Sequence, residues 1–249
     1  NSWDEAMIEQ MGRRLGAETR AQRVGVILGP GVNIKRSPLC GRNFEYYSED
    51  PLLAGKCAAA LIRGVQSNGI AACVKHFAAN SQETLRMTSD SVMDERTLRE
   101  IYLSAFETAV KDSKPWTIMC SYNRINGTFA AENKRLLTDI LRDEWGFDGY
   151  VMSDWGATTA DRVKCLEAGM ELEMPGKNAA NDKQIVDAVN NGTLDIKVLD
   201  TAVERILNIV LKYTENKQPE TKIDFEADHE EARKIADESM VLLKNDGIL

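Results

Sequence analysis

The chain has 249 residues, and its 31 lysines and arginines against 39 aspartates and glutamates give a formal net charge of −8. Hydrophobic residues make up 43% of it, which is typical of a globular protein and too high for a disordered chain. The acidic balance argues against a nucleic-acid partner, because such proteins usually need a basic surface. No apolar run reaches the ~20 residues that span a bilayer, so we expect no membrane partner. The cysteine usage, with apolar surroundings for Cys57 and Cys73, favours a reducing compartment and a cytoplasmic location.

Cysteine and histidine content restricts the kinds of site that the chain could hold. The five cysteines are odd in number and none forms a C-x-x-C pair, which makes a disulfide scaffold, a redox dithiol or a zinc ribbon a poor interpretation. The only histidines, His76 and His229, are far apart in sequence, which disfavours a histidine-based zinc or iron site. We therefore expect no metal and no cofactor.

Hydrophobic periodicity predicts helices alternating with short strands. In chain order the sequence predicts a helix over residues 4–21, a strand over 24–28, a helix over 50–68, a strand over 71–76, a helix over 94–110, a strand over 117–122, a helix over 133–146, a strand over 150–153, a weaker strand over 170–174, and helices over 182–191, 195–213 and 228–243. Such alternation is typical of a parallel sheet with right-handed helical crossovers.

A parallel sheet of this kind is either a closed TIM-type barrel or an open doubly wound sheet. Three predicted strands end in polar groups, namely Lys75 with His76, Tyr122, and Asp154. In a TIM barrel these carboxyl ends line one pocket, whereas an open sheet has a crevice between two strands. The pattern therefore favours an α/β fold with a TIM-type barrel. Five predicted strands are fewer than the eight of a closed barrel, so we expect the barrel in this chain to be incomplete.

Asp154 is the strongest candidate for a catalytic group. It follows an apolar strand and precedes Trp155, an arrangement that suits a pocket in which an indole stacks on a sugar ring. Retaining glycosidases need such a carboxylate as nucleophile, with a second carboxyl group about 5–5.5 Å away. The alternative interpretation is that Asp154 caps a helix beginning near Thr159.

Five further residues are candidates for substrate binding, each with a structural alternative. Lys75 and His76 could hydrogen-bond sugar hydroxyls, although a core histidine beside a solvent-facing lysine explains them equally well. Arg42 and Arg86 offer planar guanidinium groups suited to hydroxyls or carboxylates, but either could form a surface ion pair. Tyr122 could donate its phenol to a nucleophilic carboxylate or simply pack in the core.

Several motifs in consistent order resemble glycoside hydrolase family 3, specifically its β-glucosidases. The motifs are residues 29–34 (GPGVNI), 41–51 (GRNFEYYSEDP), 75–80 (KHFAAN), 86–88 (RMT), 94–100 (DERTLRE), 121–123 (SYN), 146–156 (GFDGYVMSDWG) and 172–176 (LEMPG). The similarity covers nearly the whole chain.

The resemblance implies roles for individual residues. Asp154 matches the family nucleophile that forms a glycosyl-enzyme intermediate. The residues that match groups lining the subsite of the cleaved sugar are Arg42, Lys75, His76, Arg86, Tyr122 and Trp155.

The resemblance also implies elements that this sequence does not match. The family's β-glucosidases take their acid/base glutamate from an α/β sandwich domain that follows the barrel. The first barrel strand, with a sugar-binding aspartate, would lie before Asn1. We therefore expect residues 1–215 to be a barrel domain without its first strand. Residues 216–249 are expected to be a linker and helix leading toward the absent domain.

Three functions follow from these expectations. The first is a retaining β-glucosidase that acts through Asp154 on a terminal glucosyl residue of a β-glucoside or oligosaccharide, with an acid/base glutamate outside this chain. The second is a catalytically incomplete sugar-binding fragment or subunit that needs a partner segment. The third, a β-N-acetylglucosaminidase or phosphorylase, is disfavoured because residues 78–80 replace the Gly/His-rich loop of that branch. The sequence leaves the oligomeric state open.

Overall fold

The structure is a computed structural model that describes residues 2–158, 161–176, 179–216, 221–247 and 249. Its α-helices are α1 (Glu5–Ala21), α2 (Pro51–Gln66), α3 (Glu95–Thr97), α4 (Ser104–Ser113), α5 (Arg162–Ala168), α6 (Ala179–Asn190), α7 (Ile196–Glu215) and α8 (Phe225–Glu238). Wider or tighter helical turns are η1 (Asn43–Glu45), η2 (Leu98–Tyr102), η3 (Ala130–Glu132) and η4 (Arg135–Glu144). The strands are β1 (Val26–Ile27), β2 (Ala71–Phe77), β3 (Asp90–Ser91), β4 (Thr117–Cys120), β5 (Arg124–Ile125), β6 (Thr128–Phe129) and β7 (Tyr150–Ser153).

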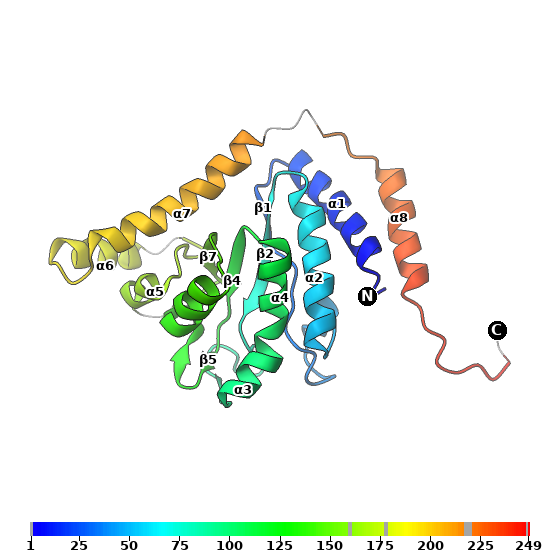
Figure 1. Ribbon diagram of the computed structural model, residues 1–249, viewed down its shortest axis with the longest axis horizontal. Helices are drawn as coiled ribbons and strands as arrows, with labels where there is room; N and C mark the ends of the chain where they lie inside the picture. The colour runs from blue at the N-terminus through cyan, green and yellow to red at the C-terminus, as the bar shows by residue number, and fades with distance from the viewer. Residues whose placement is uncertain (1, 159–160, 177–178, 217–220, 248) are drawn as a thin grey trace.

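The main sheet among the described residues has four parallel strands in the order β1-β2-β4-β7 (Figure 1). The predicted strand over residues 170–174 is reduced to one parallel bridge between Leu172 and Met152, which places a fifth segment beside β7. Helical segments connect the successive strands, as expected for parallel pairing. The protein therefore contains an incomplete TIM-type barrel, as the sequence predicted.

Both faces of the sheet are buried, which explains why the strands read as continuous apolar runs. Side chains alternate along a strand, so Ala72 and Val74 pack into the core shared with α2 and α4. Ala71 and Cys73 point to the opposite face, where Ile206 and Ile209 of α7 cover them. In Figure 1, α2 and α4 lie on one side of the sheet and α7 extends away on the other.

Local sequence signals begin the first two long helices where the sequence predicts them. Asp4 caps α1 by accepting a hydrogen bond of 2.9 Å from the Met7 amide, and Asp50 caps α2 by accepting 2.8 Å from the Leu52 amide. The two helices pack closely because Gly64 faces α1, and a Cβ there would collide with the Glu9 carbonyl. Among the described helices, none is long and apolar enough to cross a bilayer.

Several predicted elements differ from those observed. The helix expected from residue 94 is divided by the wide turns of η2, and α5, expected only in the alternative interpretation as a helix from about Thr159, begins at Arg162. The small sheet β3-β5-β6 was also missed, because its strands have two residues each and carry no readable periodicity.

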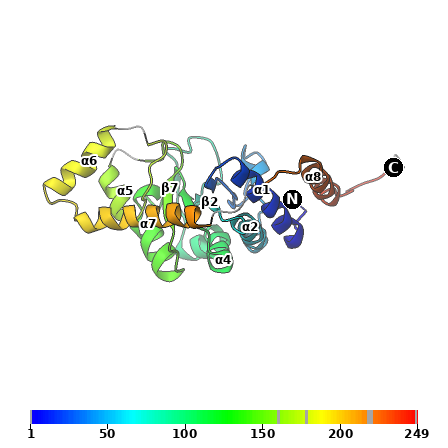
Figure 2. The ribbon, with the colours of Figure 1, turned by 90° about the horizontal axis from the view of Figure 1, so that it is seen from above.

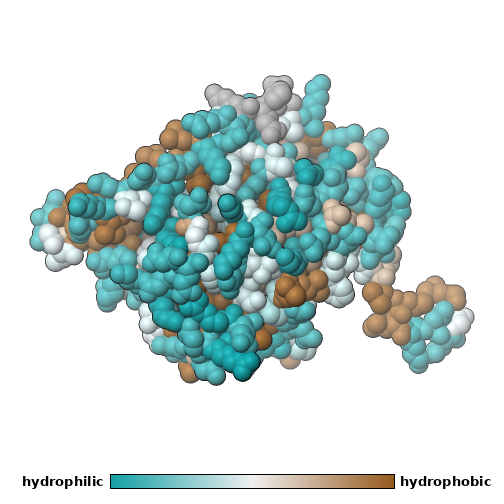
Figure 3. Space-filling model, viewed as in Figure 1, coloured by the Kyte–Doolittle hydropathy of each residue, from teal (hydrophilic) through white to brown (hydrophobic). Residues whose placement is uncertain are grey.

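The last helix was predicted too far toward the C-terminus. It begins at Phe225, capped by Asp224, and ends at Glu238 instead of 243. Residues 240–243 looked like a continuing apolar helix, but they are exposed and form the apolar tail visible in Figure 3. Viewed from above, α8 lies beyond α1, and Arg14 of α1 pairs with Asp228 of α8 at 3.2 Å (Figure 2).

Candidate active site

The seven residues proposed from the sequence form one connected cluster at the carboxyl ends of the strands. We call this cluster the Asp154 site; its members are Arg42, Lys75, His76, Arg86, Tyr122, Asp154 and Trp155. Lys75 and His76 belong to β2, Tyr122 follows β4, and Asp154 directly follows β7. The carboxyl ends of parallel strands converge, so residues up to 112 positions apart in sequence (Arg42 and Asp154) come together.

Asp154 is buried, with 7% of its surface exposed, and its two carboxylate oxygens differ. Oδ1 accepts a hydrogen bond of 2.7 Å from the Trp155 amide. Oδ2 lies 3.6 Å from His76 Nε2 and 3.9 Å from Arg42 Nη1, and it has no hydrogen-bond partner in the described part of the chain. Buried polar atoms are nearly always hydrogen-bonded, so an unpartnered oxygen on a carboxylate marks a position open to a ligand.

The backbone around Asp154 is held in place by its neighbours. The Asp154 amide donates to the Cys120 carbonyl at 3.2 Å, which ties it to β4. The Ser153 hydroxyl accepts 2.8 Å from the Met174 amide, and the Gly156 amide donates to the Met174 carbonyl at 3.0 Å. Helix α5 begins at Arg162 and is capped by Asp161, so Asp154 is not the helix cap of the alternative interpretation.

The buried carboxylate of Glu171 holds β7, the strand that ends next to Asp154. Glu171 accepts hydrogen bonds of 2.7 Å from each of Arg142, Arg205 and the amide of Val151 in β7. Its side chain is 1% exposed, and two guanidinium groups compensate the burial of its charge. The strand that carries Asp154 is therefore fixed to both η4 and α7.

Glu45, which sequence reasoning did not single out, orders two of the cations. Its Oε1 accepts 2.5 Å from Arg42 Nε, and its Oε2 lies 3.1 Å from Lys75 Nζ. Burial would raise the pKa of Glu45, but the hydrogen bond from Arg42 and the charge of Lys75 outweigh it and hold the pKa below its ordinary value. Glu45 is therefore an ionised clamp between Arg42 and Lys75.

His76 is held as a neutral ring by its surroundings. Burial, followed by the positive charges of Arg42, Lys75 and Arg86, lowers its pKa to about 2. The Tyr46 hydroxyl lies 3.2 Å from Nδ1, and burial raises the pKa of that phenol, so it can donate to Nδ1. Nδ1 also lies 3.4 Å from Asn33 Oδ1, and the other ring nitrogen, Nε2, faces Asp154.

The backbone of His76 is fixed by a single asparagine. Asn33 Oδ1 accepts 2.7 Å from the His76 amide, and Asn33 Nδ2 donates 2.9 Å to the His76 carbonyl. Neither Asn33 nor Tyr46 was proposed as a site residue, although both lie in motifs that the sequence displays at residues 29–34 and 41–51.

The opposite side of the site is built from Arg86, Tyr122 and Trp155. The Arg86 guanidinium stacks 4.5 Å from the Tyr122 ring centroid and pairs with Glu83 at 2.6 Å. Burial and the nearby Asp154 carboxylate raise the pKa of Tyr122 to about 12. Its hydroxyl donates 2.9 Å to the Trp155 carbonyl, and the Trp155 side chain remains 42% exposed as an open wall.

Glutamates position the cations around Asp154. Lys75 pairs with Glu45 and Arg86 with Glu83, and Arg42 is the cation whose contact with Oδ2 is shortest among the ion pairs of the described residues. The Tyr122 hydroxyl donates to the Trp155 carbonyl and also interacts with the Asp154 carboxylate, as the sequence suggested. The missed signal is spacing: Glu45 follows Arg42 by three residues and Glu83 precedes Arg86 by three.

The alternative given for Arg86, an ion pair near the surface, is present in its contact with Glu83, whereas the alternatives for Lys75 and His76 are not. Lys75 has a side chain only 15% exposed, and His76 is 1% exposed but bonded to side chains at the site instead of a remote core carbonyl. Within the described ranges, no group of three or more histidine, cysteine, aspartate and glutamate side chains is arranged to hold a metal ion.

Known proteins share this fold and sequence. Residues 1–209 match the N-terminal domain of glycosyl hydrolase family 3. The chain is 55% identical to thermostable β-glucosidase B of Acetivibrio thermocellus over 245 residues, which cover 98% of this chain and 32% of that protein. It is 51% identical to an exo-α-(1→6)-L-arabinopyranosidase of Bifidobacterium longum over 247 residues, covering 99% of this chain and 32% of the relative.

A solved structure matches equally well. β-Glucosidase 3B of Thermotoga neapolitana in complex with glucose superposes with a TM-score of 0.95 at 44% identity, covering 100% of this chain and 36% of that one. The chain thus spans about a third of the length of these relatives. With the family match extending over most of its residues, the chain belongs to glycosyl hydrolase family 3 and carries the family's N-terminal domain.

Proposed function

We propose that the chain is the barrel portion of a retaining β-glucosidase in which Asp154 is the nucleophile. The observation that carries the proposal is the buried Oδ2 of Asp154, which lacks a hydrogen-bond partner among the described residues and lies beside His76 and Arg42. The substrate class is a terminal non-reducing β-D-glucosyl residue, in keeping with the β-glucosidases among the relatives.

The first chemical step uses Asp154 alone among the residues of this chain. Oδ2 attacks the anomeric carbon, and the bond between that carbon and the glycosidic oxygen breaks through an oxocarbenium-like transition state. The leaving oxygen takes a proton from a general acid, and a covalent glycosyl ester forms on Asp154. Water then attacks the same carbon, gives its proton to the same residue acting as base, and releases glucose with the Asp154 carboxylate restored.

The other members of the Asp154 site bind and orient the sugar. Arg42, Lys75 and Arg86 are donors whose own glutamate partners hold them in place before substrate arrives. Neutral His76 presents its Nε2 toward the reacting region without adding a charge. Exposed Trp155 offers its indole face as one wall for the pyranose ring.

We assign the general acid to a residue outside this chain. The carboxylates that border the Asp154 site, Glu45 and Glu83, are both paired with arginine, and the lowered pKa of Glu45 keeps it ionised and unable to donate a proton. This assignment fits a chain that spans about a third of its relatives. It also favours the second candidate function, a sugar-binding fragment that does not turn over unactivated glycosides without a partner segment.

Labelling with 2,4-dinitrophenyl 2-deoxy-2-fluoro-β-D-glucoside tests the nucleophile. Its activated leaving group needs no acid, so the chain by itself should acquire one 2-fluoroglucosyl group, located on Asp154 by peptide mass spectrometry. Asp154→Asn should remain unlabelled, and Asp148→Asn, at the other end of β7, should be labelled at the wild-type rate. An adduct on another residue would overturn the assignment.

Turnover separates the two candidate functions. The chain is given 2,4-dinitrophenyl β-D-glucoside and cellobiose, with and without the remaining two thirds of a full-length relative supplied in trans. Hydrolysis of the activated substrate but not of cellobiose by the chain alone, with cellobiose turnover restored in trans, supports the proposal. Faster hydrolysis of the corresponding aryl α-L-arabinopyranoside would change the substrate to the one named for the Bifidobacterium longum relative.

A further inference from the structure

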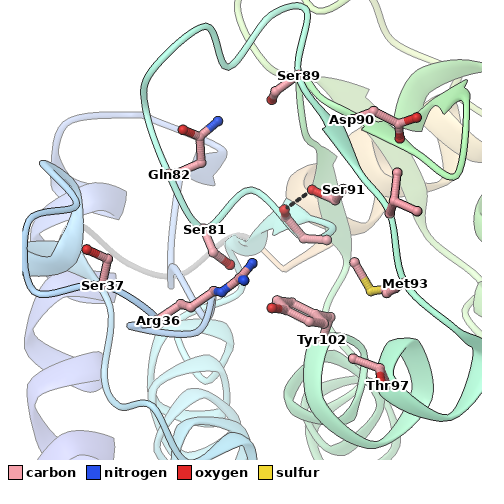
Figure 4. A pocket seen from close by; sticks show the side chains of 12 residues that line it. Arg36, Ser37, Ser81, Gln82, Ser89, Asp90, Ser91, Met93, Thr97 and Tyr102 are labelled. Carbon is pink, nitrogen blue, oxygen red and sulfur yellow. Dashed lines mark hydrogen bonds between the residues drawn. The ribbon is translucent and has the colours of Figure 1, made fainter.

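A cavity of about 650 Å³ lies beside the Asp154 site and shares none of that site's seven residues. Its walls come from the loop after β1, the loop after β2, and the segment from β3 to η2. Figure 4 shows the side chains directed into it, among them Arg36, Ser81, Met93 and Tyr102. Small-molecule sites in proteins usually occupy about 300–1,000 Å³, so the cavity is large enough for a ligand.

One buried polar group in this cavity has no partner among the described residues, while others, such as the Ser91 hydroxyl that donates to the Ala79 carbonyl, are hydrogen-bonded. Ser81 is 6% exposed, and its hydroxyl is buried with no hydrogen-bond partner in the part of the chain that the structure describes. A buried hydroxyl without a partner costs free energy, so an unpartnered hydroxyl at the wall of a cavity points to a ligand that would bond it.

The chemistry of the lining favours a neutral ligand rich in hydroxyl groups. Half of the twelve lining residues carry a hydroxyl, and one guanidinium (Arg36) and one carboxylate (Asp90) balance each other in charge. The lining therefore carries no net charge that would select an ion of either sign. Sugar hydroxyls both donate and accept hydrogen bonds, and the Tyr102 ring and Met93 thioether supply an apolar face for ring carbons.

We propose that this cavity is a second carbohydrate site, which binds a neutral mono- or disaccharide separately from the Asp154 site. Ser81 and Arg36 donate hydrogen bonds to the sugar, Asp90 accepts them, and Tyr102 contacts a ring face. Residues 79–91 separate the two sites, with Ser81 lining the cavity and Arg86 stacked on Tyr122 in the Asp154 site. A sugar in the cavity therefore contacts the loop that positions Arg86.

Methionine NMR tests the proposal, because Met93 lines the cavity. The chain is labelled with [methyl-¹³C]methionine, the Met93 signal is assigned through Met93→Leu, and methyl β-D-glucoside and cellobiose are titrated. We expect a saturable shift of the Met93 signal in the wild type, and the same affinity in Lys75→Met, which disables the Asp154 site. Because this readout involves no reaction of Asp154, failure of inactivator labelling and failure of cavity binding are observed independently.

Ser81→Ala is the informative cavity variant. Removing an unpartnered hydroxyl leaves folding intact, so its melting temperature should not fall, whereas its affinity for sugar at Met93 should weaken about fivefold. The matched control is Ser113→Ala on α4, whose hydroxyl bonds the Ala109 carbonyl away from the cavity, and it should bind like the wild type.

Three results would overturn the proposal. The first is an absent Met93 response at saturating sugar, and the second is a response that disappears in Lys75→Met, which would mean a single site. The third is tighter binding of glucose 6-phosphate or inorganic phosphate than of methyl β-D-glucoside, which would make the cavity an anion site.

Discussion

The two sides of the loop formed by residues 79–91 differ in how their charges are satisfied. On the side of Asp154, each of the three cations Arg42, Lys75 and Arg86 has a glutamate partner within 3.1 Å. On the cavity side, Arg36 and Asp90 form no ion pair among the described residues, and the Ser81 hydroxyl has no partner. Residues 79–91 therefore border two different sites. In the Asp154 site the cations are held by ion pairs, and in the cavity Arg36, Asp90 and the Ser81 hydroxyl have no such partners among the described residues.

This difference has a physical consequence for binding. Donors already held by ion pairs need little reorganisation when a reacting group develops charge, which is the usual basis of electrostatic catalysis. Groups that are unpaired and partly buried gain their hydrogen bonds only when a ligand arrives, so they contribute to affinity instead. We therefore expect substitutions on the Asp154 side to alter rates and stability, and substitutions on the cavity side to alter binding.

The largest effect on activity is expected from replacing Asp154, whose Oδ2 has no hydrogen-bond partner among the described residues. Asp154→Asn should lower hydrolysis of 2,4-dinitrophenyl β-D-glucoside at least about 1,000-fold, because no carboxylate remains to attack the anomeric carbon. Steady-state release of dinitrophenolate measures it, with Asp148→Asn expected within about twofold of the wild type. A residual rate above a tenth of the wild type in Asp154→Asn would contradict the assignment.

The glutamate partners can be removed one at a time to sharpen the comparison. Glu45 holds two cations and Glu83 one, so Glu45→Gln should slow inactivation by the 2-fluoroglucoside about 100-fold and Glu83→Gln about tenfold. The rate constant for covalent labelling, followed by intact mass, is the measurement, and Glu45→Asp should recover part of the loss. Equal losses at the two positions would show that the contact of Glu45 with both Arg42 and Lys75 contributes no more to the labelling rate than the single Glu83–Arg86 pair.

Acid titration tests whether His76 is held neutral. The unfolded chain takes up a proton near the ordinary pKa of 6.5, whereas the folded protein resists it down to about 2. The unfolded state therefore binds more protons below pH 6.5, and the free energy of unfolding should fall as the pH is lowered, with a slope that reaches about 1.4 kcal/mol per pH unit only well below that pKa. Urea unfolding at pH 7.5 and at pH 5.5 should differ by about 1.4 kcal/mol in total from this group. His76→Gln should reduce that difference, and an unchanged difference in the variant would contradict the prediction.

The smallest effect is expected on the cavity side in the absence of ligand. Arg36→Ala and Asp90→Asn remove charges that have no ion-pair partner among the described residues, so each should change the free energy of unfolding by no more than about 0.5 kcal/mol. Glu45→Gln should cost about 1–3 kcal/mol, because it leaves Arg42 and Lys75 half-buried without their partner. Similar losses on both sides, measured by urea unfolding, would remove the distinction between them.

The parts of the fold that the sequence predicted depend on signals within a few residues. The caps at Asp4 and Asp50 and the apolar runs of β2, β4 and β7 could be read directly, because each side chain acts on its own backbone or on a sheet face. The end of α8 was misplaced, because an apolar run continues past Glu238 whereas residues 240–243 are exposed and outside the helix.

The residues of the candidate site also divide into those that local sequence signals revealed and those that they did not. Asp154, His76 and Tyr122 were found because they follow buried strands, where a polar group needs a reason to be present. Glu45, Asn33 and Tyr46 were missed because their roles lie in partners 30 or more residues away. The three-residue spacing of Arg42 and Glu45 is a local signal for one ion pair, but nothing within residues 41–51 shows that Lys75 will be the second partner.

The sequence by itself determined that this is an acidic α/β chain with barrel topology and a carboxylate at a strand end, since periodicity and strand-tip chemistry are local properties. The tertiary structure decided which charges meet. It placed Glu45 between Arg42 and Lys75, covered the second face of the sheet with α7 and left the Ser81 hydroxyl, beside a cavity, without a partner among the described residues. These pairings depend on how distant segments pack, which no window of neighbouring residues contains.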